Sequence, residues 1–490
     1  NRTITFPGVP QYSLVSDILP DKFNENVVYA SFNNMFADDF KPYILKSRDK
    51  GKTWISITSK LPDNGSIHTI EQDNVNPNLL FAGSEFSFFF SIDGGNEWIE
   101  FKSGLPTISV KDIAIQERET DLVLATFGRG FYVLDDYSPL RNFKKEMLDK
   151  EGYIFPVRDA KMYVQASGFD NQGSTYFKAP NPEFGATFTY YVKDIPKTAK
   201  AIRQEKEKAL FEKGEPIPQP SGEDLLREDS EIKPYLIFTI TDESNNVVKR
   251  LYKSASKGVN RITWNYGYEG INPVTTEKFE PVSTEGRRGG GGIQAMPGNY
   301  KVSMSIYSKG ETRELASAEQ FICKPLNLST FTAIDQNSKY KWIKEASDFT
   351  RSVYGSISYA NELLKKVNSV MQAIHQTPAS TPELMKEASR INTELKDVLS
   401  IYSGPRAKAS WEELPPMDLP LSERLDNMAS ATYGTSGVIS ATAIEQLRIL
   451  HEEFPPLMNR IKKAGEDLQA LDRKLDAVKA PWTPGRVPVL

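Results

Sequence analysis

The chain of 490 residues has little of what metal and nucleophile sites are built from, with one cysteine and three histidines. A single cysteine excludes a disulfide within the chain, and the apolar neighbours of Cys323 in "EQFICKPL" predict a core position rather than a nucleophile. His68, His375 and His451 lie far apart without ligand spacing, which argues against a zinc site and a Ser-His-Asp triad. We therefore expect no metal and no cofactor.

The sequence also lacks a strong charge of one sign and a long apolar run. The formal net charge is −4, which gives no reason to expect nucleic acid or an anionic membrane as a partner. No apolar run approaches the roughly 20 residues that span a bilayer, so we expect no transmembrane segment. An apolar content of 39% and a charged content of 25% are typical of soluble globular proteins, and the length suits two to four domains.

A short motif occurs twice, as "SRDKGKTW" (47–54) and "SIDGGNEW" (91–98), with aspartates 93 − 49 = 44 residues apart. Three versions of one apolar strand, "NVVYASF", "NLLFAGS" and "DLVLATF", each follow a polar turn. A third motif position is degraded, "GRGFYVLDD" at 128–136. A period in the forties with several short strands per unit predicts blades of a β-propeller.

The motif residues have a structural interpretation. The short aspartate side chain can accept hydrogen bonds from backbone N–H groups just after it, the glycine allows positive φ, and the tryptophan can pin the hairpin to its sheet. We therefore predict a turn-forming role, rather than a chemical one, for the motif residues Ser47, Asp49, Gly51, Thr53, Trp54, Ser91, Asp93, Gly95 and Trp98.

Residues 1–145 supply about three blades, whereas a propeller needs at least four. The sequence begins at Asn1 with neither an initiator methionine nor a signal peptide, so we expect a processed or truncated chain. The partner that completes the ring would be an N-terminal propeller portion or a complementary chain. A proteolytically nicked propeller whose halves stay together is a third possibility.

Residues 146–328 change to well-separated strands, which predicts an immunoglobulin-like β-sandwich. A charged insertion at about 196–232 reads as an amphipathic helix followed by a proline-rich linker. The glycine-rich "EGRRGGGGIQ" (285–294) lacks the G-K-[ST] ending of a phosphate loop and is interpreted as a flexible loop.

Residues 329–490 show helical periodicity and predict an antiparallel bundle of three or four helices. The seam from Leu457 to Val478 advances in steps of four and three residues, which is coiled-coil spacing. Pro455 and Pro456 should kink or start that helix. We interpret the seam first as core and second as a docking surface. The predicted fold class is thus multidomain: a partial propeller, an immunoglobulin-like sandwich and a helical bundle.

The repeated motif resembles the BNR or Asp-box repeat of sialidases, sortilin-like propellers and two-propeller xyloglucanases. The longer pattern, from "DDFKPYILKSRDKGKTW" to the terminal "WTPGRVPVL", resembles a family of large secreted bacterial proteins, common in Bacteroidetes, that are called sortilin-like or glycosyl-hydrolase-like. The middle region is similar to immunoglobulin-like domains of the flagellar hook-cap type. The resemblance implies a secreted, periplasmic or cell-surface location.

No catalytic set emerges from these residues, although glycoside hydrolysis would need two carboxyl groups. Glu85 and Asp112 are weak catalytic candidates, and Asp38, Asp39 and Arg129 are possible binding residues at the propeller rim. Asp135 and Asp136 are interpreted as turn or rim groups. We prefer a non-catalytic binding or assembly protein that acts on a protein or an extracellular glycan. The alternative is the C-terminal part of a two-propeller glycoside hydrolase of xyloglucanase or sialidase type.

Overall fold

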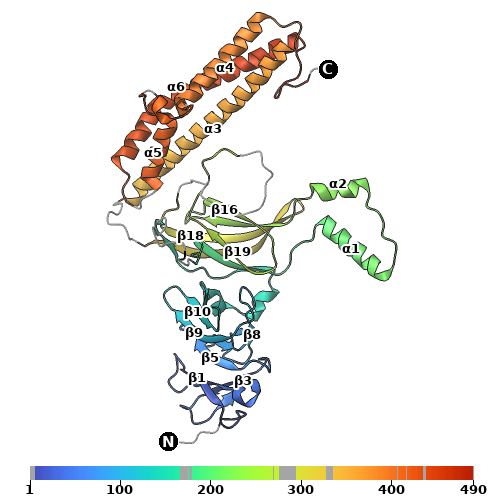
Figure 1. Cartoon of the computed structure of the whole chain (residues 1–490), viewed down its shortest axis with the longest axis vertical. Helices are drawn as coiled ribbons and strands as arrows, with labels where there is room; N and C mark the ends of the chain where they lie inside the picture. The colour runs from blue at the N-terminus through green and yellow to red at the C-terminus, as the bar shows by residue number, and fades with distance from the viewer. Residues whose placement is uncertain are drawn as a thin grey trace.

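The computed structural model describes residues 6–165, 175, 179–268, 270–274, 294–326, 335–405, 407–414, 416–433 and 437–488. The elements follow one another along the long axis in chain order: small sheets near the N-terminus, a larger β region with a projecting arm, and helices at the C-terminus (Figure 1). Within the described ranges, no helix combines the length and apolar character needed to cross a membrane.

The N-terminal part consists of three antiparallel sheets, each a meander of consecutive strands. Sheet one contains β1 (Leu14–Pro20), β2 (Val28–Asn34), β3 (Asp39–Ser47) and β4 (Ile55–Ser56). Sheet two contains β5 (Ile67–Gln72), β6 (Leu80–Ser84), β7 (Phe88–Ser91) and β8 (Ile99–Glu100). Sheet three contains β9 (Val110–Gln116), β10 (Asp121–Thr126) and β11 (Phe131–Leu134).

The sheets stack because each one buries apolar side chains against the next. Tyr29 and Ile44 of sheet one share a core with Ile70 of sheet two. Phe81 of sheet two shares another with Leu122 of sheet three. The predicted succession of short antiparallel strands is confirmed as stacked sheets, and their assignment to a β-propeller, with its closure into a ring, stays a prediction. Sheet three has no fourth strand, since after β11 the chain enters the 3₁₀ turns η2 (Ser138–Asn142) and η3 (Lys145–Asp149).

The middle part has two sheets around one core. The smaller sheet contains β12 (Gly152–Ile154), β14 (Ala186–Val192) and β17 (Gly258–Trp264). The larger has the order β13 (Ala160–Met162), β19 (Glu311–Pro325), β18 (Gly298–Ser308), β15 (Tyr235–Thr241) and β16 (Val247–Ser254). Phe188 and Trp264 of one sheet meet Phe238 of the other in that core. The immunoglobulin-like classification of this two-sheet unit stays a prediction.

Cys323 of β19 is buried, as its apolar neighbours predicted. Burial raises the pKa of its thiol to about 12, so the thiolate needed for nucleophilic attack is scarce at neutral pH.

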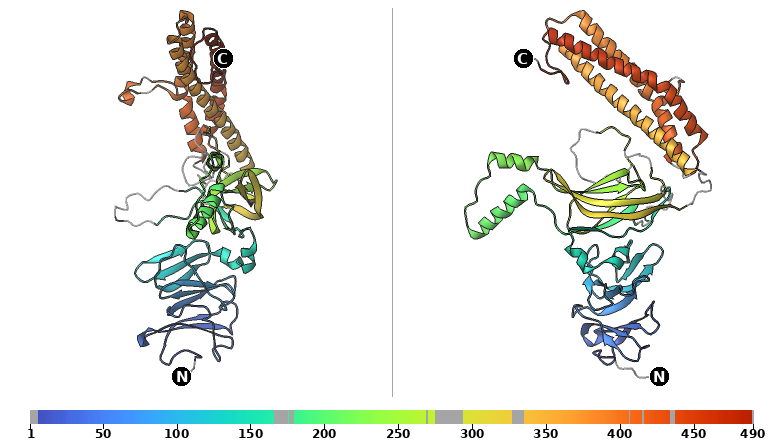
Figure 2. Two further views of the ribbon diagram at one scale, coloured as in Figure 1. Left: turned by 90° about the vertical axis from the view of Figure 1, so that its right-hand side faces the viewer. Right: turned by 180° about the vertical axis from the view of Figure 1, so that it is seen from behind.

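The insertion between β14 and β15 forms two helices, α1 (Ala199–Lys213) and α2 (Gly222–Ser230). They form an arm that projects from the two-sheet unit (Figure 2). The predicted linker is therefore wrong beyond Ser221, because the Ser221 hydroxyl accepts from the N–H of Asp224 and caps a second helix. The glycine-rich segment 285–293 lies outside the described residues.

The C-terminal part is a bundle of α3 (Gln336–His375), α4 (Pro382–Ser403), α5 (Leu421–Tyr433) and α6 (Ala441–Ala477). Its core includes Val353, Ile391, Ile461 and Leu468, all fully buried. Of the two alternatives predicted for the proline pair, a start of the last helix is wrong: α6 starts after the N-cap Ser440 and runs through both prolines. The seam of α6 is core, so its second interpretation as a free docking surface is not supported.

Candidate functional site

The stacked sheets have two edges with different chemistry. In a meander the chain reverses at alternate edges, so the turns between strands one and two and between strands three and four lie together. The turns between strands two and three, and the links from one sheet to the next, lie at the opposite edge. We call the first the box edge, because it carries the turns 47–54 and 91–98, and the second the crossover edge.

At the box edge, Asp49 is the acceptor that closes its turn. Its Oδ1 accepts from the N–H groups of Lys52 and Thr53 at 2.9 and 2.8 Å, and its Oδ2 accepts from the Thr53 hydroxyl at 2.7 Å. The bonds from Thr53 hold the pKa of Asp49 at about 2, with help from the hydroxyl of Ser47. With four donors on its two oxygens, the Asp49 carboxylate is engaged within its own turn.

The second box turn repeats this geometry and ties sheet two to sheet one. Asp93 Oδ1 accepts from the hydroxyl of Ser91 at 2.8 Å and from the N–H of Glu97 at 2.9 Å. The buried indole of Trp98 donates to the carbonyl of Ile57 at 2.7 Å. The aspartates of both turns are thus engaged by their own hairpins.

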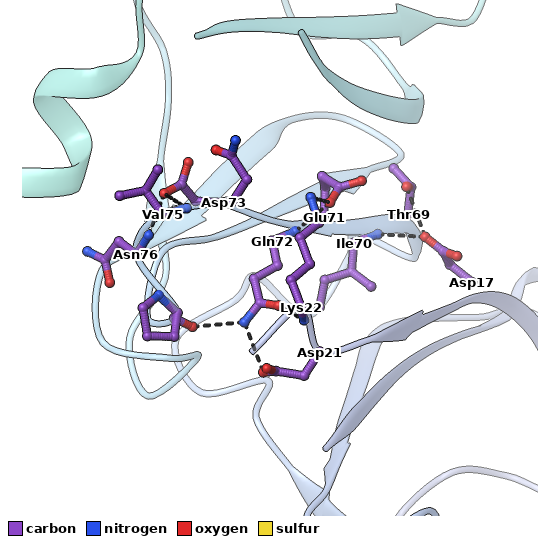
Figure 3. Close-up of polar contacts among 12 residues, drawn as sticks. Asp17, Asp21, Lys22, Thr69, Ile70, Glu71, Gln72, Asp73, Val75 and Asn76 are labelled. Atoms are coloured by element: carbon purple, nitrogen blue, oxygen red, sulfur yellow. Dashed lines mark hydrogen bonds and ion pairs between the residues drawn. The ribbon is translucent and has the colours of Figure 1, made fainter. Parts of the chain in front are cut away.

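A further repeat at this edge escaped the sequence analysis. Asp21 and Asp73 each follow the first strand of a sheet, and each accepts from the N–H groups two and three residues later. Gln72 bridges the two sheets, since its amide donates to Asp21 at 2.9 Å while its carbonyl accepts from the N–H of Lys22 at 2.7 Å (Figure 3). The available signal was D-x-x-N-x-N, which occurs at 21–26 and at 73–78.

Asp73 is fully buried and anchors the end of the stack. It accepts from the Tyr137 hydroxyl at 2.6 Å and pairs with Arg141 at 2.8 Å. Burial by itself raises the pKa of Asp73, but the bonds from Arg141, Tyr137 and the backbone outweigh it and keep the pKa below its usual value. The box edge is therefore a set of satisfied, structural carboxylates.

The crossover edge holds a charged cluster drawn from three strands or turns. Glu85, in the β6–β7 turn, lies with its Oε2 2.5 Å from Nε2 of His68 at the start of β5. Lys111, at the start of β9, donates to the same oxygen at 3.0 Å, and the hydroxyl of Ser109 does so at 3.2 Å. This cluster joins sheets two and three while part of the Glu85 side chain stays exposed.

The cluster favours an anionic glutamate beside a neutral histidine. Burial raises the pKa of Glu85, but the bonds from His68 and Lys111 outweigh it, and the pKa is lowered. Burial lowers the pKa of His68, and the charge of Lys111 lowers it further. With its proton on Nε2, neutral His68 donates to Glu85, and the Lys111 ammonium, 3.0 Å from the same nitrogen, then donates to Glu85 rather than to His68. An anionic Glu85 can accept a hydrogen bond from a ligand hydroxyl, but it is a poor proton donor at neutral pH.

Exposed phenylalanines occur in the corresponding turns of all three sheets at this edge. Phe36, Phe86 and Phe127 occupy the turns between strands two and three of sheets one, two and three. Their side chains are 89%, 46% and 74% exposed. The ammonium of Lys111 lies 5.8 Å from the centre of the Phe127 ring. Exposed apolar side chains at one edge make this edge a candidate binding surface.

The structure brings only some of the predicted site residues together. Glu85 is in the cluster, and Arg129 lies two residues beyond Phe127 in the β10–β11 turn. Asp112 lies on β9 opposite Ala125, and its carboxylate accepts from the N–H of Ile113 rather than joining Glu85.

The other predicted acids serve local structure. Asp38 is the left-handed cap of the 3₁₀ turn η1 (Met35–Ala37), and Asp39 accepts from the Tyr43 hydroxyl at 2.6 Å. Asp135 and Asp136 lie where sheet three meets the two-sheet unit, and their carbonyls accept from Arg261.

Sequence reasoning missed His68, Ser109 and Lys111. They occupy equivalent places in "SIH" (66–68) and "SVK" (109–111), 43 residues apart. Aligning the first strands of the units, rather than the box motifs, would have found them. Within the described ranges, no group of three or more His, Cys, Asp or Glu side chains is placed to hold a metal.

Comparison with solved structures gives distant likenesses. The GH74 xyloglucanase from Xanthomonas campestris is 16% identical over 28% of this chain and 22% of its own, with a TM-score of 0.23. The extracellular domain assigned to a one-component system of B. thetaiotaomicron is 13% identical, covering 66% of this chain and 32% of its own, with a TM-score of 0.19. YCF48 from Cyanidioschyzon merolae is 13% identical over 38% of this chain and 51% of its own, with a TM-score of 0.18.

The matched regions span only about a fifth to a half of these proteins. At TM-scores this low the likenesses carry no argument about the fold or activity of this chain. No family model matches the sequence, and no curated protein matches it.

Proposed function

We propose that this chain is part of a non-catalytic, secreted binding and assembly protein whose stacked sheets bind a protein or an extracellular glycan at the crossover edge. The observation that carries the proposal is that exposed Phe36, Phe86 and Phe127 lie in the turns of the crossover edge, which also carries the Glu85 cluster. Aromatic side chains next to charged groups are the usual composition of a binding surface. The family resemblance to BNR and sortilin-like proteins and the immunoglobulin-like module are part of the same proposal.

The electrostatics of Glu85 support binding over hydrolysis. A glycosidase needs a protonated acid and a second carboxyl group about 5 to 9.5 Å away. The pKa of Glu85 is lowered, which is the wrong direction for an acid. Asp112, the other candidate, is engaged by its own strand. The partly exposed Glu85 keeps the two-propeller glycoside hydrolase as the second candidate, with its other carboxyl group supplied from outside the described residues.

The exposed outer face of sheet three supports the proposal of a partner that extends the stack. Phe131 and Val133 of β11 hold the places that Phe88 and Phe90 hold in β7, as the strand registers show. Phe88 and Phe90 are at most 8% exposed beneath sheet three, whereas Phe131 and Val133 are 75% and 55% exposed. We propose that another sheet of the same kind, from a further propeller portion or a complementary chain, covers this face.

The experiment compares binding and hydrolysis on the same immobilised β-glucans and sialosides. The Phe86→Ala/Phe127→Ala double variant should lose binding, while Ile444→Ala, at a half-exposed position on α6, should keep it. No sugar release is expected from the wild-type chain. Sugar release that Glu85→Gln abolishes would establish the hydrolase instead.

If neither glycan binds, a photo-cross-linking residue at position 127 distinguishes a protein partner from no ligand at all. The same residue at position 444 serves as its control. Cross-links specific to position 127 would support a protein ligand, and their absence would leave the crossover edge without a ligand and refute the proposal.

A further inference from the structure

The arm formed by α1 and α2 is unusual because its helices have no buried residue. Both are well capped: the hydroxyls of Thr198 and Ser221 accept from the first turns, and Gly214 ends α1 in the left-handed conformation. Yet a nine-residue helix such as α2 is marginal in water without packing. The arm therefore lacks the apolar packing against other elements that normally stabilises short helices.

The two helices meet through charges rather than through apolar packing. The guanidinium of Arg203 donates to both carboxylate oxygens of Glu228 at 2.6 and 2.8 Å and to Glu207 at 2.6 Å. The large apolar side chains point elsewhere, and Phe211 and Leu226 are 75% and 72% exposed. Ile217 and Leu225 are also exposed. Each helix thus contributes one strongly exposed apolar anchor to a surface that the arm itself does not cover.

The charges of the arm are divided between its helices. The helix α1 contains five basic and three acidic residues, which gives 5 − 3 = +2, and α2 contains one basic and four acidic residues, which gives 1 − 4 = −3. A surface with a basic half and an acidic half is complementary to itself after a two-fold rotation. This is the requirement for an isologous interface between identical chains.

We propose that the arm is a homodimerisation element in which α1 of one copy packs against α2 of a second copy, and the reverse. Lys200 and Lys208, which lie on the Phe211 side of α1, would face Glu223 and Asp229 of the other arm, while Phe211 and Leu226 form the apolar centre. A second copy is favoured over an unrelated partner because the same arm supplies both charge signs and both anchors. The interface is small, so dimerisation should be weak and dependent on concentration and salt.

The test is sedimentation equilibrium of the whole chain at several concentrations, in low and high salt. The expected result is a reversible monomer–dimer equilibrium that weakens several-fold as salt rises. The Phe211→Asp/Leu226→Asp variant should raise the dimer dissociation constant at least tenfold. Lys462→Glu, an exposed charge reversal on α6, is the matched control and should leave the constant unchanged.

Charge-reversal variants of the arm test the proposed charge complementarity directly. Lys200→Glu/Lys208→Glu makes the arm mostly acidic, and Glu223→Lys/Asp229→Lys makes it mostly basic, so neither variant should form homodimers. An equimolar mixture of the two should form heterodimers, which a merely unfolded arm could not do. A monomer at every concentration, or a dimer that none of the arm variants weakens, would overturn the proposal.

Discussion

At the scale of single residues, the carboxylates of the stacked sheets differ in how completely they are hydrogen-bonded. Asp21, Asp49, Asp73 and Asp93 accept from nearby backbone or side-chain donors and lie at the box edge. Glu85 lies at the crossover edge and has partners from two other strands. The four aspartates are engaged in the box-edge turns, whereas Glu85 links sheets two and three and stays partly exposed.

Replacing Asp73 should destabilise the chain more than replacing any exposed acid. Asp73→Ala leaves the guanidinium of Arg141 and the Tyr137 hydroxyl without their buried acceptor. The expected loss is about 3–5 kcal/mol in the free energy of unfolding, measured by chemical denaturation. Asp112→Ala, at an exposed carboxylate, should change it by less than about 0.5 kcal/mol. Equal effects would show that the buried network does not stabilise the stack.

The titration of His68 tests the electrostatics of the crossover cluster. Its pKa is lowered chiefly by burial and also by Lys111, so NMR should find it below the ordinary value of about 6.5. Lys111→Ala should raise this pKa, and Glu85→Gln should lower it further. His375, an exposed histidine on α3, provides the comparison in the same spectra. A His68 pKa unmoved by either variant would contradict the cluster geometry.

The lowered pKa of His68 sets the sign of the pH dependence of the free energy of unfolding. A histidine whose pKa is lower in the folded state binds fewer protons there than in the unfolded chain. The free energy of unfolding should therefore decrease as the pH falls from about 6.5 through the folded pKa of His68. In the Lys111→Ala variant this dependence should be smaller.

At the scale of elements, the box turns pack sheets together as well as reversing the chain. Gly95 has a φ of +95°, and a Cβ at this position would lie 2.7 Å from Cδ1 and 3.2 Å from Cβ of Ile57. Ile57 belongs to the link between sheets one and two. The glycine is needed both for its backbone conformation and for the close approach of the neighbouring chain.

Gly95→Ala should therefore cost more stability than Gly104→Ala. Both positions have positive φ, but a Cβ at Gly104 would meet nothing within 4 Å. We expect about 1 kcal/mol for Gly104→Ala from backbone strain alone. For Gly95→Ala we expect roughly 2–4 kcal/mol, because the clash adds to the strain. Thermal unfolding of the two variants measures the difference, and similar losses would exclude a role for packing against Ile57.

At the scale of the whole molecule, an arginine connects the stacked sheets to the two-sheet unit. Arg261 of β17 donates to the carbonyls of Asp135 and Asp136 at 2.7 and 2.5 Å. Burial lowers the pKa of its guanidinium, although the nearby aspartates oppose this. Farther along the molecule, the rings of Tyr268 and Tyr340 meet with centroids 6.0 Å apart and link the two-sheet unit to α3.

Removing this connection should uncouple the unfolding of the two β parts. Arg261→Ala leaves two carbonyls without a donor, at a cost of about 1–3 kcal/mol. Differential scanning calorimetry should then show the two parts melting at more widely separated temperatures than in the unaltered chain. Arg118→Ala, at a side chain that is 79% exposed, is the control and should leave the profile unchanged. An unchanged profile for Arg261→Ala would mean that other contacts carry the coupling.

Much of the architecture follows from local patterns. The box motifs and the apolar strands before them predicted the stacked sheets, because the hydrogen bonds of Asp49 and Asp93 reach at most four residues along the chain. The three-and-four spacing around Ile461 and Leu468 predicted a buried helix face. Local rules failed at α2, where a serine cap ended the expected linker, and at the proline pair inside α6.

The sequence by itself determined which segments become strands, box turns and helices, since those choices rest on contacts between near neighbours. Only the tertiary structure decided which side chains meet at the crossover edge. His68 and Glu85 are 17 residues apart, and Lys111 is 26 residues beyond Glu85. His68 and Glu85 meet within sheet two through the pairing of Ile67 with Ser84, and Lys111 reaches them because sheets two and three pack around a shared apolar core that includes Phe81 and Leu122.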